Sequence, residues 1–397
     1  MHGRVLISER TQQLLDMDNS YKKRTFAFLH TGPAQYVNRV GILDQAASCI
    51  APWGDRALIS GGKHALAAVE ERLKLSLQKG GISWRKHLFT GECCSSNISK
   101  IKRKAKDLKA NVVIGIGGGK SLDAAKAAAV ELGIPVVCIP TIAATCAATT
   151  AQSVIYNGRG IFQEALILPR NPSLVLIDPG IIADAPEIYL KSGVLDSIAK
   201  WYEGRSIWPG IRNPDVQTSA AIALAKVLYK GLRRYAMEAV RLTIQHKVED
   251  SLIQTLDRIL LLTGLIQSLA KGTLFTAIAH PVHNGLTMLE GSRRILHGLK
   301  VGYGIIVQLC MEKCPDGEFE DVLSFFRGLG LEPSLKGLKL PSNRDAVRRV
   351  AEKAASDPGI GPLPYPVNKE AIASAMEYLE KKLGPCVSSG NAALQQA

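Results

Sequence analysis

Residues 111–123 decide the fold, and they read Asn-Val-Val-Ile-Gly-Ile-Gly-Gly-Gly-Lys-Ser-Leu-Asp. The apolar run at their start is typical of a strand buried inside a parallel sheet. Glycines let the backbone approach a phosphate closely, and the N-terminus of a following helix offers free N–H groups to an anion. The stretch therefore favours a pyrophosphate-binding turn between a strand and a helix. A tight turn with a purely structural role is the alternative.

The sequence around this turn alternates short apolar runs with helical patterns. Strands are predicted at residues 56–60, 86–89, 111–116, 136–140 and 173–179, and helices at 64–78, 96–108 and 122–132. Such alternation indicates βαβ units and a parallel, doubly wound sheet.

The pattern becomes helical throughout after Pro186. Helices are predicted at residues 189–203, 214–241, 248–271, 299–313, 344–356 and 369–382. We therefore expect three regions: an N-terminal arm over residues 1–24, an α/β dinucleotide-binding domain over 25–180, and an all-α domain for metal and substrate over 181–397.

Length and composition narrow the class of protein. A chain of 397 residues has room for two domains, and 46% of it is hydrophobic. No uninterrupted apolar run reaches the ~18 residues of a membrane span, and residues 1–24 lack the pattern of a signal peptide. We expect a cytoplasmic protein without a membrane partner.

The chain is basic, with a formal net charge of +14. Its lysines and arginines are spread along the sequence, and aromatic residues make up only 6%. This pattern disfavours nucleic acid as a partner and favours small anionic cofactors and substrates. The eight cysteines include no C-x-x-C pair, so a zinc ribbon is not expected.

A carboxylate and a cluster of histidines form a second candidate site. Asp196 lies in an otherwise apolar helical stretch, where it needs a partner or a metal. His280 and His283 are three residues apart, hence on one helical face, and His297 follows after a loop. One carboxylate and two imidazoles suit a divalent cation and leave positions for substrate. The alternatives are a lysine partner for Asp196 and buried, hydrogen-bonded histidines.

A dinucleotide beside such a metal predicts one reaction. The metal would bind an alcohol oxygen as a Lewis acid, and the carbon that carries this oxygen would exchange hydride with a nicotinamide. The two candidate sites therefore predict a dehydrogenase.

Several short motifs together resemble one enzyme family. They are Gly91-Glu92-Cys93 and the segments 115–123, 140–143, 196–203, 280–287 and 297–301. Over residues 25–385 the chain resembles the iron-containing alcohol dehydrogenases, most of all the glycerol dehydrogenase and hydroxycarboxylate dehydrogenase branch. The resemblance implies a dehydroquinate synthase-like fold with the active site between the two domains. It also implies NAD or NADP, one divalent metal (zinc before iron), and a homo-oligomer between a dimer and an octamer.

The resemblance also implies roles for individual residues. It assigns metal binding and catalysis to Asp196, His280 and His297, and it places His283 beside the metal as a proton relay. The cofactor-binding positions it implies are Gly62, Gly117, Gly118, Gly119, Lys120, Ser121, Asp123, Thr141, Ile142, Ala144, Thr150, Gln152 and Tyr156.

Two positions depart from the glycerol dehydrogenase pattern. Where those enzymes carry an aspartate that contacts the polyol hydroxyls, this chain has Cys146, which we assign to the substrate. The missing negative charge favours a substrate that carries a carboxylate, as in the hydroxycarboxylate branch. Gly62 replaces an aspartate of Gly-Asp-Lys, so a 2′-phosphate would meet no repulsion and NADP is expected to be accepted.

The sequence therefore predicts a metal-dependent, NAD(P)-linked oxidoreductase of a small 2-hydroxy acid/2-oxo acid or a vicinal diol. The alternatives are an NAD-linked glycerol dehydrogenase, a glycerol-1-phosphate dehydrogenase, a lyase of the dehydroquinate synthase type and a non-catalytic NAD-binding protein.

Overall fold

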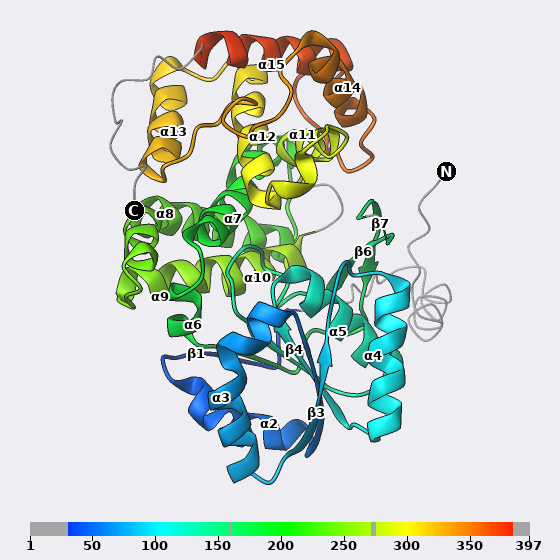
Figure 1. Ribbon diagram of the computed structural model, residues 1–397. Coiled ribbons are helices and arrows are strands. Elements are labelled where there is room, and N and C mark those ends of the chain that lie inside the picture. Colours follow the sequence, from blue (N-terminus) through cyan, green and yellow to red (C-terminus); the bar gives the residue numbers. More distant parts are fainter. Residues whose placement is uncertain (1–30, 159, 271–274, 384–397) are drawn as a thin grey trace, which may run out of the picture.

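The computed structural model describes residues 31–158, 160–270 and 275–383. A six-stranded, wholly parallel sheet lies at one end of the molecule (Figure 1). Its strands follow the order β1-β8-β5-β4-β2-β3. Its strands are β1 (Gln35–Asn38), β2 (Arg56–Gly61), β3 (Ser83–Leu88), β4 (Val112–Gly117), β5 (Val136–Pro140) and β8 (Leu174–Ile177). The predicted parallel sheet is confirmed. The predicted arm over 1–24 lies outside the described residues.

Helices cover both faces of this sheet. In Figure 1, α2 (Ala46–Ile50) and α3 (Lys63–Lys79) lie on one side of it, and α4 (Ser95–Leu108) and α5 (Gly119–Leu132) lie on the other. Alternate residues of β4 face opposite layers, so Ile114 packs in the α3 layer and Val113 in the α5 layer. All six residues of β4 are buried, which explains why its sequence is apolar without alternation.

The strand order creates a topological switch between β2 and β4. From β2 the chain continues to β3 on one side, whereas from β4 it continues to β5 on the other side. Gly61, the last residue of β2, pairs in register with Ile116 of β4. Ligands of doubly wound sheets bind outside the carboxyl ends of the strands at such a switch. Gly62 and the glycine turn therefore lie at the same sheet edge.

A small antiparallel hairpin follows the sheet strands β4 and β5. It consists of β6 (Gln152–Tyr156) and β7 (Phe162–Ile167) and was not predicted from the sequence. Asp123 of α5 holds it, since its side chain accepts a hydrogen bond from the Val154 N–H and its carbonyl accepts one from the Ser153 hydroxyl.

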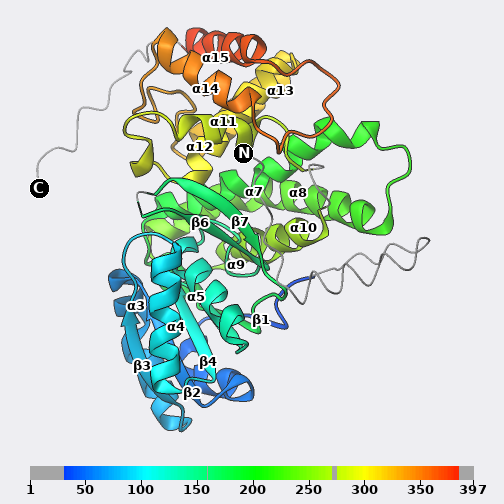
Figure 2. The ribbon, with the colours of Figure 1, turned by 90° about the vertical axis from the view of Figure 1, so that its right-hand side faces the viewer.

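The regular elements described after Asp178 are all helical. They are α6 (Pro179–Ala183), α7 (Glu187–Ile207), α8 (Val216–Ile244), α9 (Asp250–Leu256), α10 (Thr263–Leu269), α11 (Ala279–Leu286), α12 (His297–Met311), α13 (Asp316–Gly328), α14 (Arg344–Ala355) and α15 (Lys369–Leu383). Figure 2 shows this helical region beside the sheet and its hairpin. The predicted all-helical character is confirmed, while α6 and α13 were not predicted. The domain limits at residues 24/25 and 180/181 stay predictions.

The predicted helix over 248–271 differs from the structure. A π-helical segment, Asp257–Leu262, separates α9 from α10. Asp257 accepts hydrogen bonds from Tyr36 and Asn38 of β1, both at 2.7 Å. By length and composition alone, the stretch Asp250–Leu269 could cross a membrane. Here it packs against α8, and its buried side chains belong to the largest apolar cluster.

Close backbone contacts join the sheet region to the helical region. A Cβ on Gly193 of α7 would lie 2.0 Å from the carbonyl oxygen of Ala143, so only glycine permits this approach. Ala143 lies in the loop after β5, residues 141–151. Thr149, further along this loop, donates a hydrogen bond to the carbonyl of Leu260. The loop after β5 is therefore packed directly against α7 and the π-helical segment.

Candidate metal centre and cofactor site

Three side chains from three helices converge beside this loop. Asp196 lies in the middle of α7, His280 is the second residue of α11, and His297 is the first residue of α12. The Nε2 atoms of His297 and His280 lie 3.1 Å and 3.5 Å from Oδ1 of Asp196. One ligand atom from each residue lies within 4.8 Å of the others. The structure therefore brings the predicted metal ligands together.

Glycines on α12 make this convergence possible. A Cβ on Gly298 would lie 1.8 Å from the carbonyl oxygen of Ser192, and one on Gly304 would lie 2.3 Å from that of Ala279. The Gly298 N–H also donates to the Ser192 hydroxyl at 3.1 Å. Because α12 touches both α7 and α11 at these points, His297 faces Asp196.

A buried carboxylate orients His280. Oε2 of Glu203, on α7, lies 2.5 Å from Nδ1 of His280. The other oxygen, Oε1, accepts the backbone N–H groups of Ala277 and His280. With Nδ1 held by Glu203, the ring presents Nε2 toward Asp196. This carboxylate–histidine pairing is the usual support of a metal-binding imidazole.

A chain of polar side chains supports His297 from the opposite side. Nδ1 of His297 lies 2.9 Å from Nε2 of His283, and Nδ1 of His283 lies 3.0 Å from Oδ1 of Asn284. The Asn284 amide donates to Asp357 at 2.7 Å. His283 thus contacts a predicted metal ligand rather than the point where the three donors meet. A proton relay through it stays a prediction.

The carboxylates of the site favour a positive charge between the three donors, which a bound cation or a proton on His280 can supply. Burial opposes ionisation of Asp196, but His297 and His280 outweigh it and hold the pKa of its carboxyl well below the usual range. Burial also opposes protonation of His280, yet Glu203 and Asp196 raise its pKa to about 9. The pKa of His283 falls well below its usual value, because of burial and the neighbouring His297. A carboxylate and two Nε2 atoms directed at one point form a donor set for a divalent cation with open positions.

The glycine turn lies at the carboxyl end of β4. Gly117 has a φ of +127°, a conformation that favours glycine, and a Cβ on Gly118 would lie 2.6 Å from Ile142. Among the described residues, no side chain caps the N-terminus of α5. Its first N–H groups and the positive end of its dipole are suited to a phosphate. Lys120, predicted to bind the cofactor, pairs with Glu92 at 2.7 Å.

The other predicted cofactor residues form two groups. Gly62, Gly119, Thr141, Ile142 and Ala144 lie in turns at the carboxyl ends of β2, β4 and β5 or directly after them. Ser121, Asp123, Thr150, Gln152 and Tyr156 lie on α5 or in and beside the β6–β7 hairpin, where they form hydrogen bonds with other residues of the protein. A cofactor contact of either group stays a prediction.

Asp123 has a structural partner. Its Oδ1 lies 2.9 Å from Nζ of Lys126, a fully buried lysine that also donates to the Ala147, Thr150 and Gln152 carbonyls. This pair connects α5 with the loop that carries Cys146.

Cys146, the predicted substrate residue, lies close to the converging donors. Burial, with a further contribution from Asp196, raises the pKa of its thiol to about 12. The thiol is therefore neutral at physiological pH.

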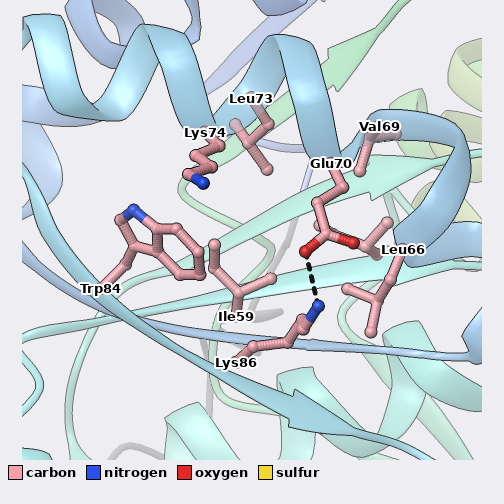
Figure 3. Close-up of a pocket in the computed structure, with 9 residues that line it drawn as sticks. Ile59, Leu66, Val69, Glu70, Leu73, Lys74, Trp84 and Lys86 are labelled. Atoms are coloured by element: carbon pink, nitrogen blue, oxygen red, sulfur yellow. Dashed lines mark hydrogen bonds and ion pairs between the residues drawn. The ribbon is translucent and has the colours of Figure 1, made fainter.

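A separate hollow beneath α3 is too small to be the active site. It encloses about 20 Å³ among apolar side chains such as Ile59, Leu73 and Trp84, and an ion pair of 2.5 Å joins Glu70 to Lys86 beside it (Figure 3). This volume admits about one water molecule.

Comparisons with known proteins show the family of this chain. The profile of the family described as iron-containing alcohol dehydrogenase matches residues 33–179. A glycerol dehydrogenase of Escherichia coli O6:H1 (strain CFT073) is 33% identical over 330 residues, covering 82% of this chain and 89% of the relative. Hydroxycarboxylate dehydrogenase A of Escherichia coli K12 is 32% identical over 353 residues, covering 88% and 96%. The chain belongs to the iron-containing alcohol dehydrogenase family.

A solved structure extends this family assignment to the fold. The probable glycerol dehydrogenase of Sinorhizobium meliloti 1021 superposes with a TM-score of 0.79 at 32% identity, covering 90% of this chain and 99% of that one. The predicted fold class is confirmed. As a member of the iron-containing alcohol dehydrogenases, the protein is a glycerol dehydrogenase-like, metal-dependent oxidoreductase that acts on alcohol groups.

Sequence reasoning missed some side chains that support this family's metal site here. Glu203 follows Asp196 by seven residues, so two turns of α7 place both on one face. Two carboxylates with this spacing in a helix buried on all sides could have indicated that both Asp196 and Glu203 belong to the site. Asp357 gave no comparable signal, because it meets Asn284 only through the tertiary fold.

Proposed function

We propose that the protein transfers hydride between NAD(P) and a small 2-hydroxy acid/2-oxo acid or a vicinal diol, with a divalent metal held by Asp196, His280 and His297. The observation that carries this proposal is the convergence of these three donors next to the loop that follows β5. When bound, the metal supplies Lewis-acid activation of the substrate oxygen. We expect zinc before iron.

The protein's own residues have separate tasks in this reaction. Glu203 fixes the tautomer of His280, and His283 contacts Nδ1 of His297, the ring nitrogen that points away from Asp196. The free N–H groups at the start of α5 would hold the pyrophosphate, which orients the nicotinamide toward the metal. The loop after β5 closes the site from the sheet side.

Two observations bear on the substrate. The neutral thiol of Cys146 brings no negative charge, so an anionic substrate is not repelled there. Similarity to hydroxycarboxylate dehydrogenase A supports an acid, whereas similarity to glycerol dehydrogenases supports glycerol as the rival.

Cofactor choice, assembly and location belong to the same proposal. At Gly62 no carboxylate opposes a 2′-phosphate, so NADP should be accepted beside NAD. A homo-oligomer between dimer and octamer and a cytoplasmic location are expected, which sedimentation and cell fractionation would test. No nucleic-acid or membrane partner is part of the proposal.

A substrate panel with the purified protein tests the function. Small 2-oxo acids, glycerol and 1,2-diols are offered with each nicotinamide cofactor, with zinc or iron added. We expect turnover of at least one 2-oxo acid and loss of bound metal together with activity in Asp196→Asn. Metal content is measured by mass spectrometry. Undiminished turnover by a metal-free Asp196→Asn variant would refute the metal's role.

A further inference from the structure

Helix α7 carries a buried lysine that the proposed reaction has not yet used. Lys200 is only 9% exposed, and no hydrogen bond or ion pair joins its ammonium group to any of the described residues. An ammonium group without a protein partner needs water or an anion beside it. The other buried lysines of the described residues have partners, since Lys126 pairs with Asp123, Lys191 pairs with Glu187 and Lys300 donates to Ser292.

Lys200 lies on the face of α7 that forms the metal site. It follows Asp196 by four residues and precedes Glu203 by three, so all three side chains share one helical face. Its charge acts on the pKa values of Cys146, Glu203 and His280, which places the ammonium within electrostatic reach of each.

The neighbouring loop covers this face from the sheet side. Gly193, two turns before Lys200, touches the Ala143 carbonyl, and the same loop continues to Cys146. Lys200 therefore lies where α7, the loop and the candidate metal site meet.

The formal charges of the site favour an anion. The carboxylates of Asp196 and Glu203 balance a divalent cation, while the thiol of Cys146 adds no charge. Lys200 then adds a positive charge on this face of α7. A neutral diol does not use this charge, whereas a carboxylate neutralises it.

We propose that Lys200 binds the carboxylate of the substrate and so selects small 2-hydroxy and 2-oxo acids over neutral diols. This inference rests on the proposed function and narrows its substrate class. The cofactor pyrophosphate is expected at the glycine turn beside Lys120, which leaves Lys200 free to bind the substrate.

Oxamate, an unreactive analogue of a small 2-oxo acid, provides a binding test that does not depend on turnover. Zinc-loaded enzyme with bound NAD(P)H is titrated with oxamate by calorimetry. In Lys200→Met we expect the Kd of oxamate and the KM of a 2-oxo acid to rise about tenfold to hundredfold. Lys200→Arg should retain most of the binding. The Kd of NAD(P)H and the KM of glycerol should stay within about twofold.

Lys191→Met is the matched control. Lys191 is a buried lysine of the same helix, but it already pairs with Glu187. Lys200→Gln replaces Lys200→Met if the latter unfolds, as judged by thermal unfolding and zinc content. Unchanged oxamate binding, or an equal loss for oxamate and glycerol, would overturn the role of Lys200. A wild-type enzyme that oxidises glycerol but binds no oxamate would also overturn the role of Lys200, while the proposed dehydrogenase function would stand. Oxamate binding without any turnover would instead refute the proposed function.

Discussion

At the scale of single residues, the metal site depends on which nitrogen each imidazole presents. His280 can offer an unprotonated Nε2 to a metal only while its remaining proton lies on Nδ1, toward Glu203. Both oxygens of Glu203 accept hydrogen bonds, one from the His280 ring and one from two backbone N–H groups. All groups that face this carboxylate are therefore donors.

Glu203→Gln should weaken metal binding. The glutamine amide must turn its NH₂ either toward the imidazole or toward the backbone N–H groups, so a donor then faces a donor. We expect the Kd of zinc to rise about tenfold to hundredfold, measured by competition with a chromogenic chelator. Glu187→Gln, which changes a half-exposed carboxylate on the same helix, is the control and should bind zinc normally. Equal zinc affinity in both variants would contradict the orienting role.

Gly62→Asp should shift cofactor preference toward NAD. Among the described residues, no atom lies within 4 Å of a Cβ at this position, so the aspartate fits without strain. Its charge would repel a 2′-phosphate and could accept the ribose hydroxyls. The ratio of kcat/KM for NADP to that for NAD should fall about tenfold or more. Gly317→Asp, equally unhindered but on α13, should leave the ratio unchanged. An unaltered ratio in Gly62→Asp would show that this edge of the sheet does not hold the ribose.

The sequence predicted some of these residues because their chemistry is visible locally. Asp196 lies in an apolar helix, and three of the eight histidines lie close together in the sequence, so both features suggested a metal. Lys200 was not singled out, because a lysine in a helix is usually solvated. Only its burial distinguishes it from an ordinary surface lysine.

At the scale of elements, α5 connects the glycine turn to the hairpin and the loop that carries Cys146. Its Lys126 donates to three carbonyls of residues 147–152, and Asp123 receives the Val154 N–H. The strands β2, β4 and β5 could be predicted because their apolar runs are long. The hairpin could not, because Asp123 anchors β6 from a distant position and β7 is largely exposed.

Lys126→Met should destabilise the protein strongly. The substitution leaves Asp123 buried without its cation and three carbonyls without their donor. We expect a loss of about 3–5 kcal/mol in the free energy of unfolding, measured by urea denaturation. The double variant with Asp123→Asn should lose less than the two single losses added together. As a control, Lys102→Met breaks a more exposed pair with Glu131 and should cost at most about 1 kcal/mol. Similar losses in both lysine variants would argue against a buried anchor.

At the scale of the whole molecule, the site exists because a helix of one region touches a loop of the other. The order of strands followed by helices was visible in the sequence, but the way the two regions face each other was not. This contact depends on Gly193, whose missing side chain leaves no signal in a hydrophobic pattern. The placement of Cys146 relative to α7 follows from that approach and from the hydrogen bond between Thr149 and Leu260.

Gly193→Ala should therefore impair both stability and catalysis. Alanine favours a helix by about 1 kcal/mol over glycine, so helix propensity alone predicts a gain in stability. Here the added Cβ would lie 2.0 Å from a backbone oxygen, and either α7 or the loop must move. We expect a lower Tm in thermal unfolding and a lower kcat/KM, because the loop shifts relative to the metal ligands. Gly317→Ala, with no atom within 4 Å among the described residues, should keep both values or raise Tm slightly. A Gly193→Ala enzyme with unchanged Tm and kinetics would mean that the two regions can separate at this contact without disturbing the site.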